Sequence, residues 1–222
     1  MPSYRIAEAA HYLAIPAATL RAWTVGQPYA TEAGPRLFAP LISIAQTKPP
    51  LLSFLNLVEI HVLDAIRREH KLSLQKVRKA LTYVGERFPS AHPLADQTFM
   101  TDGLDLFIER YGRLVNISQA GQLAMRGLLE AHLRRIERDS AGLPIKLYPF
   151  TRKHDAHEPK RIVIDPAVSF GRPALAGTGI ATAVVVERYK AGESVDDLAE
   201  DYGRHRLDIE EAIRCELDVQ AA

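Results

Sequence analysis

The spacing of hydrophobic residues predicts that the chain begins with two short helices. Apolar positions recur at helical spacing between Ile6 and Leu13. Pro16 ends this pattern and suits the first turn of a second helix, in which Leu20 and Trp23 form an inward pair. The sequence therefore predicts a helix, a tight turn and a second helix, which is the unit that places a helix in the major groove of DNA.

Helical periodicity returns in the second quarter of the chain. Residues 26–40 are rich in glycine and proline and predict a loop or hairpin after the second helix. Apolar residues then recur at helical spacing in residues 53–68 and 74–87, and charged residues occupy the other faces. We therefore expect two longer helices, separated by a break that Ser73 can cap.

The middle of the chain shows a different pattern. Between residues 98 and 117, short apolar runs are separated by Asp102-Gly103 and by a second turn signal, which predicts a small β-meander. Residues 118–139 follow as a long predicted helix that begins at a serine cap. Residues 145–148 predict a short strand that returns to the meander.

The last third begins with a polar segment. Residues 151–160, TRKHDAHEPK, have no apolar period and predict a domain linker. A strand is expected at residues 161–165, and three short helices are expected between residues 183 and 217, the second opened by a capping box at Ser194. Turn conformations that favour glycine are expected at Gly171, Gly177 and Gly179.

These elements predict a mainly α (α+β) fold with an N-terminal winged helix-turn-helix, a small β-meander with a long helix, and a small C-terminal three-helix domain with short strands. We expect residues 1–88 to form a DNA-binding region, residues 94–149 to support dimerisation, residues 150–160 to be a linker, and residues 161–222 to form the C-terminal domain. The length of 222 residues favours two domains or one elongated domain.

Composition narrows the class of protein. Hydrophobic residues make up 47% of the chain and charged residues 25%, as in ordinary globular proteins, and no apolar run is long enough for a membrane span. The first residues lack the layout of a signal peptide, so we expect a cytoplasmic protein. The single cysteine, Cys215, excludes an internal disulfide and a cysteine-clustered zinc site.

Candidate enzymatic or metal chemistry is sparse. No motif places a nucleophile, a base and a stabilising group together, so we expect a protein that is not an enzyme and needs no cofactor. One dense group of metal-ligand residue types lies in the predicted linker, where we expect solvated side chains rather than a metal site: His154, Asp155, His157 and Glu158.

The formal net charge of +1 conceals a division along the chain. Residues 1–160 carry 21 Lys and Arg against 15 Asp and Glu, whereas residues 161–222 carry 7 against 12. This asymmetry indicates different partners for the two parts, and the basic part is the better candidate for nucleic acid.

The second predicted helix carries the candidate DNA contacts. Thr19 and Arg21 can point outward, and their hydroxyl and guanidinium groups suit phosphates or base edges. Arg36 in the following hairpin can contact phosphate as a wing does. The alternatives are a purely structural helical hairpin and a solvated loop charge at Arg36.

The N-terminal motifs resemble a known family. YRIAEAAHYLAIPAATLRAW, the loop PRLF, and LLSFLNLVEIHVLDAIRREHKLSLQKVRKAL together resemble the DNA-binding domain of the MerR family across residues 4 to 84. That resemblance implies a helix-turn-helix, a wing and two further helices. It also implies a phosphate-anchoring role for Arg21, whereas Ala22 stands where the family usually has tyrosine.

The C-terminal motifs resemble another family. VIDPAVSFGRPALAGTGIATAVVVERYKAGESVDDLAEDYGRHRLDIEEAIRCE is similar to the bacterial domain of unknown function 433, and the whole chain resembles VapB-type antitoxins with a MerR-like head. The resemblance implies an antitoxin that binds double-stranded operator DNA and neutralises a PIN-type ribonuclease toxin. We expect a homodimer, because a single short helix rarely supplies enough contact and two heads would bind one pseudo-palindromic site. Because PIN nucleases hold metal with carboxylates, basic residues are the candidate toxin contacts: Arg204, Arg206, Arg152 and Lys153.

A second interpretation stays open. The chain can be a MerR-like transcription regulator that has no toxin partner and senses a small ligand in its middle domain. The pocket would then lie around Phe99, Phe107 and Tyr111. Gene neighbourhood separates the two interpretations, because an adjacent nuclease gene indicates an antitoxin and an adjacent transporter or enzyme gene indicates a sensor.

Overall fold

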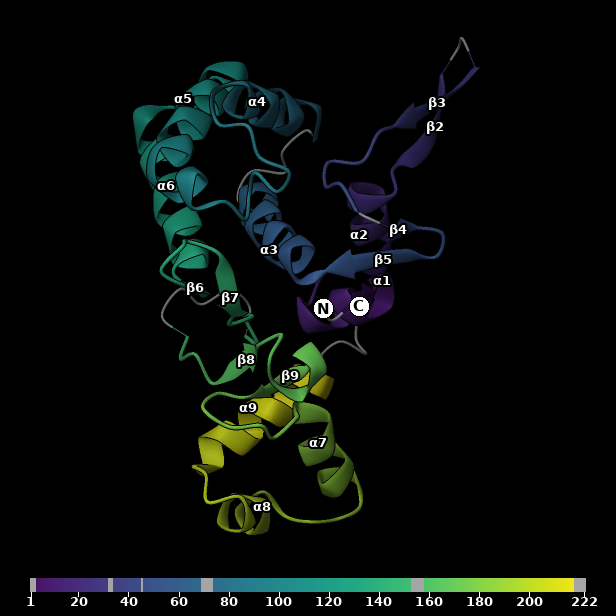
Figure 1. Ribbon diagram of the computed structural model, residues 1–222, viewed down its shortest axis with the longest axis vertical. Coiled ribbons are helices and arrows are strands. Elements are labelled where there is room, and N and C mark those ends of the chain that lie inside the picture. Colours follow the sequence, from purple (N-terminus) through teal and green to yellow (C-terminus); the bar gives the residue numbers. More distant parts are fainter. Residues whose placement is uncertain (1–2, 32–33, 45, 69–73, 153–157, 218–222) are drawn as a thin grey trace.

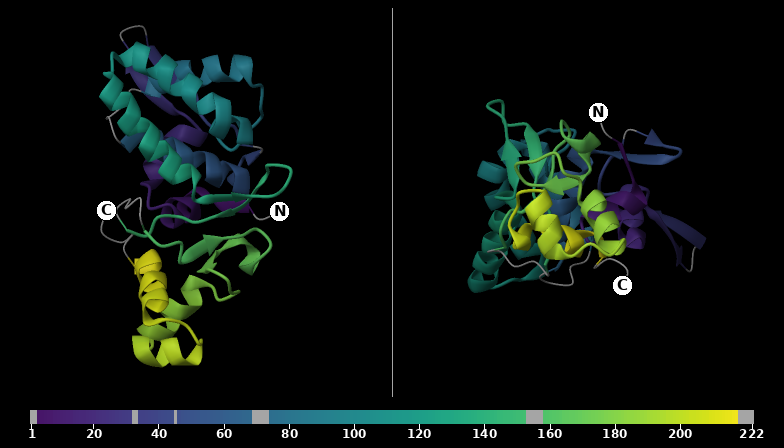
Figure 2. Two further views of the ribbon diagram at one scale, coloured as in Figure 1. Left: turned by 90° about the vertical axis from the view of Figure 1, so that its left-hand side faces the viewer. Right: turned by 90° about the horizontal axis from the view of Figure 1, so that it is seen from below.

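The computed structural model describes residues 3–31, 34–44, 46–68, 74–152 and 158–217. The chain is an α+β protein, as predicted, in which helices are combined with small antiparallel sheets (Figure 1). The molecule is elongated (Figures 1 and 2). One end holds the hairpin of β2 (Gln27–Thr31) and β3 (Gly34–Phe38) and the helices α4 (Leu74–Arg87) and α5 (Leu104–Val115). The other end holds the helices α7 (Thr182–Lys190), α8 (Val195–Asp201) and α9 (Arg206–Leu217).

The N-terminal part contains the predicted pair of helices and the hairpin. Buried Leu20 and Trp23 point into the core, which confirms their inward placement. β1 pairs with β5, and β5 pairs with β4, so residues 3–5 are held in a small sheet beside α1. The elements are β1 (Ser3–Arg5), α1 (Ile6–Tyr12), α2 (Ala17–Thr24), β2 (Gln27–Thr31), β3 (Gly34–Phe38), β4 (Gln46–Thr47) and β5 (Pro50–Ser53).

The middle part is helical, and the predicted β-meander over residues 98–117 is wrong. A π-helical turn, η1 (Phe99–Gly103), leads directly into α5 (Leu104–Val115), so Asp102-Gly103 is not a hairpin turn. The buried side chains of α5 recur at helical spacing: Leu104, Phe107, Ile108 and Tyr111. The other helices here are α3 (Phe54–Arg68), α4 (Leu74–Arg87) and α6 (Gln119–Leu133).

The helix predicted for residues 118–139 ends earlier, at Leu133. The chain then forms β6 (Ile136–Arg138), because the buried Arg135 side chain turns inward and donates hydrogen bonds to the carbonyls of Tyr148, Pro149 and Glu158. The predicted strand at residues 145–148 is present as β7 (Pro144–Leu147), but it pairs with β6 and β8 rather than with a meander.

The C-terminal part continues that sheet and adds the three predicted helices. The capping box at Ser194 is confirmed, and Gly171 and Gly177 adopt positive φ values, whereas Gly179 does not. The elements are β8 (Ile162–Ile164), the 3-10 turn η2 (Ser169–Gly171), β9 (Pro173–Leu175), α7 (Thr182–Lys190), α8 (Val195–Asp201) and α9 (Arg206–Leu217).

The buried apolar side chains form two clusters. One joins the N-terminal and middle parts, and the other lies among β8, β9 and the C-terminal helices. The N-terminal part also contacts the C-terminal part, because the Tyr4 hydroxyl donates to the Gly171 carbonyl at 3.0 Å and His11 Nε2 lies 2.9 Å from a Glu216 carboxylate oxygen. The division into four segments stays a prediction.

Candidate nucleic-acid interface

The unit α1–turn–α2 has a tightly fixed turn. Ala14 adopts a left-handed conformation with a φ of 51°, and the Ile15 amide donates to the Ala10 carbonyl at 3.0 Å. The Pro16 carbonyl accepts hydrogen bonds from the Thr19 and Leu20 amides, so the proline directly precedes α2 as its N-cap residue. Because Leu20 and Trp23 are fully buried, the orientation of α2 around its axis is set by the core.

The structure places the predicted contact residues on different surfaces. Arg21 is exposed, whereas Thr19 is half-buried. Residues two positions apart on a helix are separated by about 200° around its axis, so these side chains do not form one patch. Arg36 is exposed on β3, directly opposite Tyr29 of β2, and the hairpin that carries them projects from the body of the molecule as a wing (Figure 1).

The root of this wing, the β2–β3 hairpin, is fastened to helix α2. The amides of Leu41 and Ile42 donate to the Trp23 carbonyl at 2.7 and 3.0 Å. Gly26, which joins α2 to the wing, has a φ of 93°, and a Cβ atom there would lie 2.6 Å from the Phe38 carbonyl oxygen. Glycine is therefore required where the end of the helix and the returning strand approach each other.

Arg78 of α4 provides a second attachment for the wing. Its guanidinium lies 4.8 Å from the centre of the Phe38 ring and donates hydrogen bonds to the Ala39 and Pro40 carbonyls. Arg78 was not among the residues expected from the sequence to serve the interface. The sequence feature that could have identified Arg78 is its helical spacing from Leu74 and Leu81, which are half-buried on the same face of α4.

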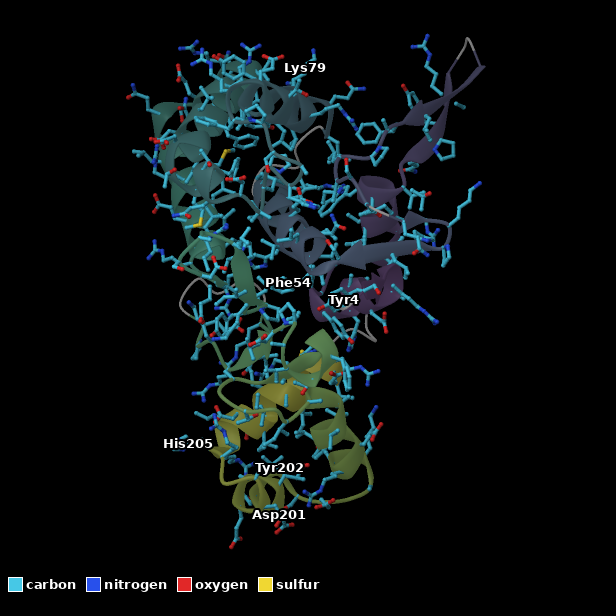
Figure 3. All side chains as sticks on the ribbon, viewed as in Figure 1. Tyr4, Phe54, Lys79, Asp201, Tyr202 and His205 are labelled. Atoms are coloured by element: carbon cyan, nitrogen blue, oxygen red, sulfur yellow. The ribbon has the colours of Figure 1, made fainter. Side chains whose placement is uncertain are left out.

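Among the basic side chains that the structure describes in the N-terminal half, several make no ion pair within the protein. Arg21 and Arg36 make none with any residue that the structure describes, and neither do Lys76 and Lys79 on the exposed face of α4. Lys79 lies at the end of the molecule opposite to Asp201 (Figure 3). A surface of unpaired cations can neutralise phosphates without first breaking a contact within the protein.

The predicted toxin contacts have a different environment, because each of the described ones is paired within the chain. Arg152 lies 2.8 Å from Glu211, and Arg204 lies 3.4 Å from Asp208. Arg206 bridges Asp196 and Glu210, and hydrogen bonds to these two carboxylates raise its pKa. Lys153 lies outside the described residues.

Two separate segments of the chain match models of known protein families. Residues 2–81 match the family model described as "Putative DNA-binding HTH domain", and residues 162–214 match that of "Protein of unknown function (DUF433)". The chain combines an HTH-type DNA-binding domain with a DUF433 domain. The boundaries of the first match enclose α1, α2, the wing, α3 and part of α4.

Relatives that match over most of their length come from Mycobacterium tuberculosis. The chain is 29% identical to a protein named "Putative antitoxin VapB45", covering 91% of this chain and 89% of the relative. It is 24% identical to "Uncharacterized protein Rv2308", covering 95% and 88%. The crystal structure of Rv2018 shares the fold, with a TM-score of 0.68 and 23% identity over 96% of this chain and 98% of that one.

The predicted linker is anchored where the structure describes it. The buried Glu158 carboxylate accepts hydrogen bonds from the Thr151 and Arg152 amides, and its side chain lies 3.7 Å from Arg135. Burial opposes ionisation of Glu211 in the DUF433 domain, but hydrogen bonds from Arg152, Thr151 and Arg214 outweigh it and lower its pKa. These contacts join the linker to helix α9.

The residues expected to line a ligand pocket form the core instead. Phe107 stacks on Tyr111 with their ring centres 5.7 Å apart and packs edge-on against Phe99, and all three are buried. A largely apolar groove of about 700 Å³ lies elsewhere, between the HTH domain, β7 and the first loop of the DUF433 domain. Its lining includes Ile44, Phe54, His92, Ile145 and Pro166.

Two observations concern metal binding and the membrane. Within the described ranges there is no group of three or more His, Cys, Asp and Glu residues placed to hold a metal ion. His154, Asp155 and His157 of the linker group fall outside those ranges. Among the helices that the structure describes, none has the length and apolar character needed to cross a membrane.

Proposed function

We propose that this chain is a cytoplasmic antitoxin that binds operator DNA through its HTH domain and neutralises a PIN-type ribonuclease toxin, acting by binding rather than by catalysis. The observation that carries the DNA half is the Arg21 guanidinium, which makes no ion pair with a described residue and lies on a helix whose orientation the buried Leu20 and Trp23 fix. The name of the 29% identical relative, "Putative antitoxin VapB45", supports the antitoxin role.

In this proposal α2 lies in the major groove and the wing follows the backbone, as in MerR-like domains. Arg21 contacts phosphate or guanine, and Arg36 contacts phosphate. Thr19 lies on another side of α2 and is not part of this contact. The α1–α2 unit is short, so two heads on a pseudo-palindromic site would supply the contact that one lacks.

Helix α6 is our candidate for the contact between the two copies. Its Leu123 side chain is 68% exposed, and the neighbouring Ala120, Ala124 and Gly127 are also exposed. An apolar side chain flanked by small residues lets a second helix approach closely. A homodimer formed through α6 would hold the two α2 helices at a fixed separation.

Gel-shift titrations with the intergenic DNA upstream of the gene test the DNA half. We expect binding that weakens steeply with salt, and Arg21→Ala should weaken it and lower the slope of log K against log salt by about 1, as expected for one lost phosphate contact. Arg113→Ala is the matched control, because Arg113 is also exposed but is paired with Glu109 on α5. Binding that is insensitive to salt, or equal in the two variants, contradicts the proposal.

Co-expression with the product of the adjacent gene tests the toxin half. We expect a PIN-type nuclease there, and we expect it to co-purify with the chain and to be silent in RNA cleavage assays until the two are separated. A neighbouring nuclease that stays active and does not co-purify contradicts this half while leaving operator binding intact.

A ligand-sensing regulator is the second candidate, and the apolar groove of about 700 Å³ favours it. A cavity of this size can hold a small molecule. Because the groove lies between the HTH and DUF433 domains, a ligand there would contact both. A transporter or enzyme gene next door, and a thermal shift with its substrate, would favour this candidate.

A further inference from the structure

One loop of the DUF433 domain presents an aromatic side chain to solvent. Phe170 is 89% exposed, more than any other large apolar side chain that the structure describes. Single exposed apolar residues are common on protein surfaces, so exposure alone assigns no role to Phe170. The backbone and the charges around it distinguish this residue from the others.

The backbone that carries Phe170 is held in a strained conformation. Ser169 and Phe170 have φ values of 48° and 57°, in the left-handed region that residues with a Cβ rarely adopt. The Ser169 hydroxyl donates to the Gly179 carbonyl at 2.7 Å, and the Gly171 amide donates to the Val168 carbonyl at 2.9 Å. Such strain persists where neighbours over-determine it, and it concentrates at functional sites.

The HTH domain also holds this loop in place. The buried Tyr4 of β1 donates its hydroxyl hydrogen to the Gly171 carbonyl at 3.0 Å. Figure 3 shows Tyr4 where the N-terminal part meets the DUF433 domain. Phe170 is therefore presented by a loop that is fixed from two sides, and a partner that binds it loses little free energy in ordering it.

The residue two positions further along, Arg172, is exceptional among the arginines of this domain. It is exposed and makes no ion pair with any described residue. The other arginines of residues 158–217 all do, with Asp or Glu of the same domain: Arg161, Arg188, Arg204, Arg206 and Arg214. Among these described arginines, Arg172 alone can bind an outside carboxylate without giving up an internal one.

We propose that Phe170 and Arg172 form the anchor through which the DUF433 domain holds the toxin; this deepens the proposed function and rests on it. The partner surface that fits is an apolar pocket for Phe170 bordered by carboxylates for Arg172, and a nuclease that holds its metal with carboxylates would supply those acidic groups. Aromatic residues and arginine are the residue types that dominate binding energy at protein interfaces. Arg204 and Arg206, paired with Asp208 and Asp196, then stabilise the domain rather than bind the toxin.

The test measures binding of the purified adjacent-gene nuclease to the full-length chain by calorimetry. Phe170→Ala and Arg172→Glu should each raise the dissociation constant by about thirtyfold, the size of a hot-spot loss. Phe170→Leu, which keeps an apolar side chain, should lose less. The matched controls are Val184→Ala, an exposed apolar residue of α7, and Lys190→Glu, an exposed cation of the same helix; both should bind as the wild type does.

The outcomes separate this inference from the proposed function. If the wild type binds the nuclease and Phe170→Ala and Arg172→Glu bind it equally well, the inference is overturned and the proposed function is not. The same conclusion follows if Arg206→Glu is the one variant that loses binding. A Phe170→Ala variant that binds the nuclease normally but changes oligomeric state in light scattering assigns the surface to a second copy and also overturns it. A wild-type chain that does not bind the nuclease overturns both. Thermal melting of each variant verifies that it folds.

Discussion

Replacing Gly26 by alanine tests how the wing is joined to the recognition helix. Gly26 has a φ of 93°, and a methyl group at this position would meet the Phe38 carbonyl oxygen at 2.6 Å. Phe38 is held in its position, because the Arg78 guanidinium lies 4.8 Å from the centre of its ring and donates hydrogen bonds to the Ala39 and Pro40 carbonyls. The substitution therefore strains both the backbone of residue 26 and the root of the wing.

The magnitude follows from these two contributions. A left-handed conformation costs an alanine about 1–2 kcal/mol relative to the right-handed one. Forcing an extra methyl group against packed atoms costs about 1–3 kcal/mol more. The free energy of unfolding of Gly26→Ala should thus fall by about 2–5 kcal/mol, which is a large part of the stability of an ordinary domain.

Gly34→Ala is the matched control for this substitution. Gly34 lies at the other end of the same hairpin with a φ of 106°, but no described residue has an atom within 4 Å of where its Cβ would be. It should therefore lose only the conformational contribution, about 1–2 kcal/mol. Urea unfolding followed by circular dichroism gives both values, and gel shifts should show weaker operator binding for Gly26→Ala. Equal losses in the two variants would refute the close approach of Gly26 to Phe38.

Two further predictions concern the HTH domain and its surroundings. Arg78→Ala should speed hydrogen exchange of the β2–β3 amides, because the wing loses its attachment to α4. Lys79→Ala removes the exposed cation next to Arg78 and should leave this exchange unchanged. Equal protection of the amides in the two variants would contradict the attachment. Burial raises the pKa of Glu59, and its hydrogen bond to His92 raises the pKa of that histidine. Both groups bind their protons more tightly in the folded protein than in the unfolded chain. Their contribution to the free energy of unfolding is therefore complete below the pKa values of the unfolded chain, and it is lost as the pH rises through the pKa values of the folded protein. Unfolding by urea at pH 5 and pH 8 should show this loss, and Glu59→Gln should reduce it; an equal difference in both proteins would contradict the assignment.

The sequence predicted the elements whose signals are local. Pro16 marked the start of α2, and the apolar period of residues 53–68 and 74–87 marked α3 and α4, because buried positions repeat with the period of the helix. Residues 98–117 were misread because Asp102-Gly103 is a strong turn signal and outweighed the period of α5. The buried face of α5 packs beside α4 and α6, and these contacts favour the helix that the period of Leu104, Phe107, Ile108 and Tyr111 indicates.

The end of α6 could not be predicted for a related reason. No glycine or proline separates Leu133 from Ile136, so the local pattern continues as a helix. The chain leaves the helix because Arg135 donates to carbonyls that lie 13 to 23 residues further along. Contacts of this kind depend on where the chain returns, which sequence periodicity does not encode.

The number of charged residues in the sequence also does not identify which of them are free to bind a partner. A count of basic residues treats Arg21, Arg36, Arg204 and Arg206 as equal, and the sequence alone assigned all four to partners. The structure divides them: Arg204 and Arg206 lie beside carboxylates of their own domain, whereas Arg21 and Arg36 make no ion pair within the described residues. A paired arginine must lose one carboxylate before it gains another, so its net contribution to binding a partner is small. The unpaired arginines are therefore the better candidates for phosphate or carboxylate contacts, and that distinction follows from the folded arrangement rather than from the number of charges.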